Sequence, residues 1–272
     1  MAVLADYHLH SSFSGDSETP MEEMIEKGLE LGLKQMCFTE HMDMDFIYVK
    51  PEETGMFELD TEAYRCGLKK CREKYADRIT IGCGVEIGVQ PHISEKLTDY
   101  VNRHDFDFVI ASSHVCNRKD PYYPYFYEGR SESEAYGEYF ASILDNLKKF
   151  SDFDVYGHLD YVVRYGPNKD GEYSYGKYKE ILDTILEWLA CHGKGIEINT
   201  GGLGYGLKEP NPCTDIIRRY RELGGETVTI GSDAHVPERI AQSFSRAEEI
   251  LKNCGFQYYA VFSGRVPQYI KL

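Results

Sequence analysis

The feature that most restricts the fold of this chain is a repeated alternation between short apolar runs and longer amphipathic stretches. The apolar runs have the length of strands and occupy residues 3–10, 35–41, 79–88, 106–114, 153–160, 194–202 and 227–235. A stretch with helical periodicity follows each run, at residues 20–33, 60–76, 92–104, 131–150, 175–193, 213–225 and 238–255. Strand and helix that alternate in this way predict βα units and a parallel α/β sheet, which can be open and doubly wound or closed into a barrel.

Three further local features accompany this pattern. The first amphipathic stretch starts with Pro20 and carries acidic residues in its first turn, so Thr19 is the expected N-cap. Residues 256–272 predict a strand-like tail with no helix after it. A long insertion, residues 116–130, follows the fourth run and is rich in aromatic side chains. Its cluster is either a lid or substrate wall, or a surface loop folded on its own rings; the members are Tyr122, Tyr123, Tyr125, Phe126 and Tyr127.

Length and composition limit the classes of function. The 272 residues are 42% hydrophobic, enough for a large core, and α/β barrels reach this length as one unit, so we expect a single domain over 1–272. The net charge of -15 argues against nucleic-acid or anionic-membrane partners, and an anionic substrate would need local cations. Eight scattered cysteines without a CxxC pair, and no secretory n-region, favour a cytoplasmic protein. The composition makes no prediction of oligomeric state.

The ends of the apolar runs carry side chains that bind metals. They are His8, His10, His41, Glu86, His114, His158, Asp233 and His235, and Glu40 directly precedes His41. Six of the nine histidines lie at such ends, whereas His92, His104 and His192 do not. The C-terminal ends of parallel strands share one rim, and residues i and i+2 of a strand point to one face. The pairs His8/His10 and Asp233/His235 have this spacing, so we expect all these side chains to converge.

The chemistry of this set predicts a metal centre that performs hydrolysis. Imidazole and carboxylate without thiolate suit Zn, Mn or Fe better than Ca or Mg. With Asp16 included there are nine candidate ligands, which suit two or three ions, with Glu86 as the natural bridge. Such ions acidify a bound water and neutralise phosphoryl charge. No GxSxG or GxxxxGK[ST] motif competes, and the Gly-rich segment 201–206 indicates an active-site loop better than a nucleotide site.

Seven ordered motifs resemble the polymerase-and-histidinol-phosphatase (PHP) family, and within it the histidinol-phosphate phosphatases of PHP type. The motifs are DYHLHSSFSGDS, FTEHMD, GVEIG, SSHV, YGHLDYVVRYG, EINTGG and IGSDAH. The resemblance implies a distorted (β/α)7 TIM-like barrel with three divalent transition-metal ions, Zn, Fe or Mn, at its C-terminal rim. Carried over by motif, the ligand sets are His8, His10, Glu86 and Asp233; Glu86, His114 and His158; and Asp16, His41 and His235.

The reaction that this resemblance implies is hydrolysis of L-histidinol phosphate to L-histidinol and phosphate in histidine biosynthesis. A hydroxide that bridges two ions would attack phosphorus, and His235, Asp233 or a metal-bound water would supply the leaving-group proton. Arg164 is the leading candidate for a phosphate-binding side chain, and Arg118 is a weaker one. The candidates for the substrate's amine are three acids in plausible loops, Glu40, Asp43 and Asp160. Any of them could instead orient a histidine ligand.

Three alternative functions stay open at this point. The first is a PHP-family phosphoesterase that acts on a nucleotide or another small phosphomonoester, because the metal motifs describe only the shared chemistry. The second is a metal-binding module without catalysis, which the complete ligand set disfavours. The third is a barrel amidohydrolase, which ranks last because no lysine stands at the end of an apolar run.

Overall fold

The computed structural model describes residues 3–272, and its central element is a parallel sheet whose strands follow one another in chain order. The strands are β1 Ala5–Leu9, β2 Gln35–Met42, β3 Thr80–Gly88, β4 Phe108–Ser112, β5 Val155–Tyr156, β6 Gly195–Asn199 and β7 Val228–Gly231. Every neighbouring pair from β1 to β7 is parallel. The strand sequences are almost entirely buried, as expected for a parallel sheet covered by helices.

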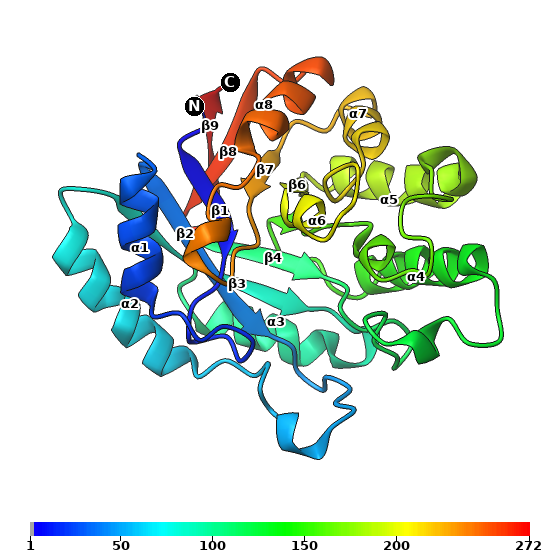
Figure 1. The fold of residues 1–272 in the computed structure, drawn as a ribbon, viewed down its shortest axis with the longest axis horizontal. Helices are drawn as coiled ribbons and strands as arrows, with labels where there is room; N and C mark the ends of the chain where they lie inside the picture. The colour runs from blue at the N-terminus through cyan, green and yellow to red at the C-terminus, as the bar shows by residue number, and fades with distance from the viewer. Residues whose placement is uncertain (1–2) are drawn as a thin grey trace.

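The sheet curls into a barrel that is nearly closed between its first and last strands. A single bridge joins Leu9 to Ala234. The backbone N–H of His10 donates to the Ala234 carbonyl at 2.9 Å, and that of Asp233 donates to the His8 carbonyl at 2.7 Å. The predicted (β/α)7 TIM-like barrel is confirmed, and the open doubly wound alternative is excluded. Figure 1 shows the strands at the centre and the helices around them.

Helices alternate with the strands around the barrel. They are α1 Met21–Glu30, α2 Thr61–Tyr75, α3 Ser94–Arg103, α4 Glu132–Leu147, α5 Lys179–Cys191, α6 Gly201–Gly204, α7 Thr214–Glu222 and α8 Phe244–Asn253. Each long helix buries its apolar stripe; in α1 the buried residues include Met21, Met24 and Ile25. Within residues 3–272, no helix has the length and apolar character needed to cross a membrane.

Two local predictions about helix starts are wrong. Thr19 does not cap α1; Pro20 holds the N-cap position, and the Thr19 hydroxyl donates to the carbonyl of His235 at 3.2 Å. The last helix does not begin near residue 238, because Ala241 and Ser243 have left-handed φ values of 53° and 60°. A left-handed backbone cannot continue an α-helix, so α8 starts only at Phe244.

The tail predicted to be strand-like forms an antiparallel hairpin that covers the N-terminal end of the barrel. Its strands are β8 Tyr258–Ser263 and β9 Val266–Lys271. The Tyr7 hydroxyl donates to the Phe262 carbonyl at 3.0 Å, and the rings of Phe108 and Phe262 lie 4.9 Å apart. The opposite, C-terminal end of the barrel is thereby left as the open end.

Candidate metal centre

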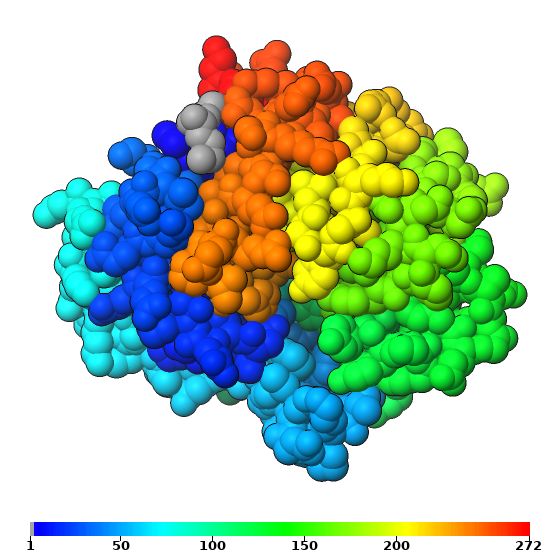
Figure 2. All heavy atoms as spheres, viewed as in Figure 1, coloured from blue at the N-terminus to red at the C-terminus, as the bar shows by residue number. Residues whose placement is uncertain are grey.

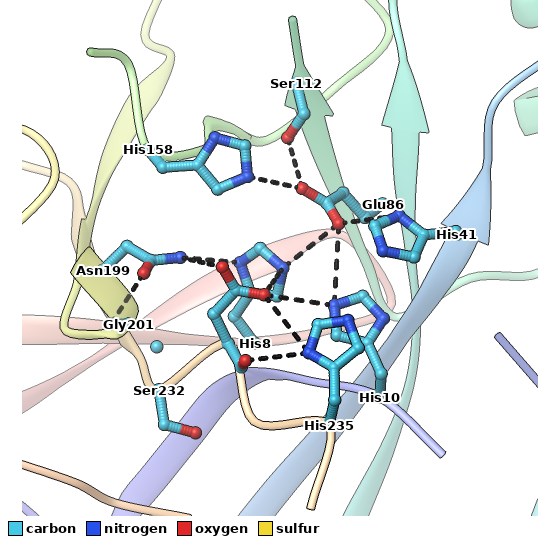
Figure 3. A network of polar contacts seen from close by, with 12 residues as sticks. His8, His10, His41, Glu86, Ser112, His158, Asn199, Gly201, Ser232 and His235 are labelled. Carbon is cyan, nitrogen blue, oxygen red and sulfur yellow. Dashed lines mark hydrogen bonds and ion pairs between the residues drawn. The ribbon is translucent and has the colours of Figure 1, made fainter. Parts of the chain in front are cut away.

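The carboxylate of Glu86, near the end of β3, lies at the centre of a cluster of histidines at the C-terminal rim. Its Oε2 atom lies 3.2 Å from His8 Nε2, 3.1 Å from His41 Nδ1 and 3.6 Å from His10 Nε2. Its Oε1 atom lies 2.7 Å from His158 Nε2 and 3.2 Å from His114 Nε2. Figure 3 shows His8, His10, His41 and His158 around this carboxylate. One carboxylate thus contacts histidines from β1, β2 and the ends of β4 and β5, as a bridging ligand must.

The other predicted ligands complete the same cluster. Asp233 Oδ1 lies 3.6 Å from His8 Nε2 and 3.5 Å from His10 Nε2. Asp16 Oδ2 lies 3.1 Å from His235 Nε2 and 3.5 Å from His41 Nε2. The structure therefore brings all nine predicted ligands together, and several groups of three present ligand atoms close enough to share an ion.

The hydrogen bonding of the cluster fits cations at its centre. Ten buried side-chain polar atoms lack a hydrogen-bond partner within residues 3–272, and seven of them belong to this region. They are His8 Nε2, His10 Nε2, His41 Nδ1, Asp43 Oδ2, Glu86 Oε2, His158 Nδ1 and His235 Nε2. Buried polar groups are normally paired, so a concentration of unpaired nitrogen and oxygen atoms indicates a missing positive partner. Imidazole nitrogen and carboxylate oxygen are suitable ligands for divalent transition metals.

Burial and neighbouring charges together set the pKa values of the cluster. Burial by itself would raise the pKa of Glu86, but the positive charges of His8, His114 and His41 outweigh it and hold that pKa well below its usual range. Burial, together with the nearby charges of His235 and His41, lowers the pKa of His10 to about 3. The pKa of His114 is raised to about 10, because Asp43 and Glu86 outweigh the effect of its burial. A cation that binds here would displace protons from such histidines.

Two predicted substrate contacts lie against the histidine cluster: Asp43 contacts it directly, and Glu40 does so through Ser14. Glu40 is fully buried, and its carboxylate accepts hydrogen bonds from the backbone and hydroxyl of Ser11 and from the hydroxyl of Ser14. Ser14 Oγ lies 3.1 Å from His10 Nδ1. Asp43 Oδ1 lies 2.7 Å from His114 Nδ1. These placements argue against a substrate contact for Glu40 and favour ligand orientation by both acids.

Arg164 lies beside the metal cluster, as expected for a phosphate-binding candidate. It is buried, and its Nη1 donates to Asp233 Oδ2 at 2.8 Å. Its Nε and Nη2 donate to the side-chain carbonyls of Asn211 and Asn199, both at 2.8 Å. These three bonds use one N–H on each nitrogen, so two guanidinium N–H groups remain for an anion.

The other two predicted substrate contacts do not reach the cluster. Asp160 is buried, and it accepts from Asn211 Nδ2 at 2.6 Å and from the backbone of Cys213 at 2.9 Å. It supports the asparagine that holds Arg164. The Arg118 side chain is 62% exposed and pairs with Asp45 Oδ2 at 3.3 Å. Neither residue is therefore positioned to contact a molecule bound at the rim.

A cavity of about 450 Å³ opens over the cluster and extends toward the aromatic insertion. Tyr161 lies 5.1 Å from the His158 ring, Tyr165 lies 5.0 Å from Tyr161, and Tyr122 lies 5.2 Å from Tyr165, as ring-centroid distances. This row of tyrosines leads from the metal cluster to the insertion. Asp120, which is 95% buried, also lines the cavity. Figure 2 shows the hollow on this face, bordered by blue, yellow and green segments from distant parts of the chain.

Part of the insertion lines the cavity, and part of it packs into the core. Tyr122 and Tyr123 line the cavity, whereas Phe126 and Tyr127 are buried in the core. Asp120 accepts from the backbone of Tyr122 at 2.8 Å, and burial raises the pKa of Asp120 to about 6. The Gly-rich segment 201–206 forms α6, and Tyr205 after it also lines the cavity.

Two buried side chains of β6, Glu197 and Asn199, also face the cluster although neither is among the predicted ligands. Their spacing of i and i+2 near the end of a strand is the same as that of His8 and His10. That spacing was the signal that could have identified them, within the EINTGG motif.

The PHP domain family model matches residues 6–201, which is most of the chain and includes seven of the nine predicted ligands. The chain belongs to the PHP domain family. Among its PHP relatives, the histidinol-phosphatase of Lactococcus lactis subsp. lactis is 35% identical over 261 residues, which cover 95% of this chain and 94% of the relative.

Solved structures agree with this membership. The crystal structure of histidinol phosphate phosphatase from the same Lactococcus species, complexed with zinc, L-histidinol and phosphate, superposes with a TM-score of 0.87 at 32% identity and covers 97% of this chain and 98% of its own. A protein from Listeria monocytogenes shares the fold with a TM-score of 0.77 at 19% identity, and the match covers 89% of this chain and 99% of that one.

Proposed function

We propose that this PHP protein is a metal-dependent phosphatase that hydrolyses L-histidinol phosphate to L-histidinol and phosphate, a step of histidine biosynthesis. One observation carries the proposal: a single cavity joins the Glu86-centred histidine cluster to an aromatic, acidic wall. The first part suits a phosphate ester, and the second suits a cationic organic group. The 35% identity to a histidinol-phosphatase over nearly the whole chain supports the same conclusion.

The cluster would hold three divalent ions, of Zn, Fe or Mn. The contacts around Asp16, Glu86 and Asp233 support the three ligand sets that the resemblance implies. When bound, such ions would acidify a water for attack on phosphorus and neutralise charge on the phosphoryl oxygens.

Arg164, Asp233 and His235 would act on the phosphate end of the substrate. The two free guanidinium N–H groups of Arg164 would bind a phosphoryl oxygen and orient the ester. His235 is partly exposed at the cavity, and its Nε2 atom is unpaired except for the Asp16 ion pair. His235, Asp233 or a metal-bound water would then relay a proton to the alkoxide of L-histidinol as it leaves.

Asp120 and the tyrosine row would bind the organic end of the substrate. L-Histidinol phosphate carries an ammonium group and an imidazole. A carboxylate attracts the ammonium, and the faces of Tyr161 and Tyr165 can accept a cation or stack on a flat ring. Among the other acids that line the cavity, Asp16, Glu86 and Asp233 are predicted metal ligands, Asp43 pairs with His114 and Glu53 pairs with Lys50, which leaves Asp120 for the ammonium.

A panel of phosphomonoesters tests the proposal. We expect purified, zinc- or manganese-loaded protein to hydrolyse L-histidinol phosphate with a kcat/KM about 100-fold above that for p-nitrophenyl phosphate, a nucleoside monophosphate and phosphotyrosine. Equal kcat/KM values across the panel would favour a general phosphoesterase. Loaded protein that binds its ions and hydrolyses no ester would instead favour a metal-binding module.

A further inference from the structure

Strand β6 is the one strand of the described barrel with no predicted ligand either within it or two residues after its end, yet its carboxylate Glu197 contacts two of the ligands. Glu197 Oε1 lies 2.7 Å from His8 Nδ1, and Glu197 Oε2 accepts from the backbone N–H of His158 at 2.9 Å. Asn199 Nδ2 donates to the same Oε2 at 3.2 Å. We propose that Glu197 is a positioning residue that fixes His8 and His158 together for metal binding, the first through its ring and the second through its backbone.

The contact with His8 determines which ring nitrogen is available. A carboxylate accepts hydrogen bonds, so the proton between Glu197 and His8 lies on Nδ1. In the neutral ring that can bind a cation, the lone pair is then on Nε2, the atom that faces Glu86 Oε2 at 3.2 Å and Asp233 Oδ1 at 3.6 Å. Glu197 therefore selects the form of His8 that can donate a lone pair to a cation.

The hydrogen bond from the His158 backbone to Glu197 takes the place of a strand-to-strand bond just beyond the end of the β5–β6 ladder. Strand β5 contains only Val155 and Tyr156, and its ladder with β6 ends at Tyr156 and Ile196. Two residues later, His158 has a φ of 22°, a backbone conformation that L-residues rarely adopt. The hydrogen bond to Glu197 Oε2 holds this strained residue while its Nε2 lies 2.7 Å from Glu86 Oε1.

The barrel leaves space for this carboxylate at a glycine of the next strand. A Cβ atom at Gly231 on β7 would overlap both Glu197 Oε1 and the Cβ of His8. Glu197 is also fully buried, and its carboxylate makes three hydrogen bonds, so few other conformations of this side chain would keep all three. The position of Glu197 between two histidines is thus set by packing as well as by charge.

Glu197→Gln tests the inference, which rests on the metal site of the proposed function. A glutamine keeps the shape but has one acceptor oxygen, so it cannot accept from both His8 Nδ1 and the His158 backbone. We expect the Zn²⁺ affinity, measured by chelator competition without substrate, to fall about 10- to 100-fold. Asp154→Asn is the matched control: Asp154 also accepts from a backbone N–H, that of Val109, but at the N-terminal end of the barrel. We expect D154N to keep wild-type zinc affinity.

Wild-type zinc affinity and stoichiometry in E197Q would overturn the inference. Because the assay uses zinc alone, failure of the phosphatase assignment in the substrate panel is a separate result. If E197Q does not fold, ¹⁵N NMR of histidine-labelled, zinc-loaded wild-type protein decides the question. A His8 ring with protonated Nδ1 and zinc on Nε2 supports the inference, and the reverse arrangement contradicts it.

Discussion

The two ends of the barrel use polar residues in opposite ways. At the N-terminal end, Asp107 accepts hydrogen bonds from Arg72 and from the backbone of Cys83 and Gly264. Asp154 accepts from Arg265. At the C-terminal end, nitrogen and oxygen atoms of the predicted ligands are buried without hydrogen-bond partners in residues 3–272. The carboxylates at the N-terminal end are thus paired within the protein, whereas the ligand atoms at the C-terminal end remain available to a bound cation.

At the reactive end, the backbone is also strained at two positions. Asp233 and His158, two of the predicted ligands, have positive φ values of 56° and 22°. Such conformations persist only when surrounding contacts hold them, and they concentrate at functional sites. This barrel therefore places stability at the end covered by the β8–β9 hairpin and reactivity at the opposite rim. Substitutions at the two ends should therefore affect different measurements.

The largest effect is expected at the centre of the reactive end. Glu86→Gln removes the carboxylate shared by five histidines and should lower kcat/KM by about 1000-fold, since metal-ion stabilisation supplies several kcal/mol and each 1.4 kcal/mol is tenfold. Steady-state kinetics and elemental analysis of the same sample measure the effect. A variant with full activity would contradict the bridging role.

A substitution at the covered end should lower stability and leave activity unchanged. Phe262→Ala removes a buried ring that packs on Phe108, and the free energy of unfolding should fall by about 3–5 kcal/mol. Denaturant unfolding measures the loss. The metal content and kcat/KM of the folded fraction should match those of wild type. A matching loss of activity would remove the distinction between the two ends.

An intermediate effect is expected for Arg164→Lys. Lysine keeps the charge but has three N–H donors on one nitrogen, so it cannot bond Asp233, Asn199, Asn211 and a phosphate at once, and kcat/KM should fall by about 30- to 100-fold. The inhibition constant for inorganic phosphate should rise in parallel. Arg118→Lys is the matched control, because that exposed arginine lies away from the cluster and should be neutral. Equal losses in the two variants would argue against the phosphate contact.

The smallest effect is a pH-dependent one at the aromatic wall. Burial raises the pKa of Asp120 to about 6, so the carboxylate is charged above that pH and neutral below it. KM for L-histidinol phosphate should rise as pH falls through this value, because the ammonium loses its partner. Asp120→Asn should raise KM about tenfold at pH 8. The ratio of KM between variant and wild type should then approach one at low pH. This ratio cancels the titration of the substrate, and a constant ratio would exclude Asp120 from recognition.

Much of the fold and the ligand set could be predicted from local patterns. Alternating periodicities of two and 3.6 residues specify strands and helices, and parallel strands bring their C-terminal ends to one rim whatever their separation in sequence. The His8/His10 and Asp233/His235 spacings identified side chains that share a face. The structure brings His8 and His10 to Glu86, Asp233 to His8, and His235 to Asp16. The choice of a closed barrel required the family resemblance.

Other features depended on contacts between residues distant in sequence. Glu40 and Asp160 have the same local character as substrate-binding acids, but each is buried against partners from another loop or strand. Thr19 does not cap α1, because its hydroxyl donates to the carbonyl of His235, which lies 216 residues away in the sequence. Glu197 contacts His8 and His158, which lie 189 and 39 residues away in the sequence.

Strand periodicity is a local property of the backbone, so the amino-acid pattern alone specifies which side chains reach the C-terminal rim. Which carboxylates face the cavity and which orient the histidines behind it depends on the folded structure. That division depends on packing between strands, such as the room that Gly231 leaves for Glu197, and no local pattern in either strand records it.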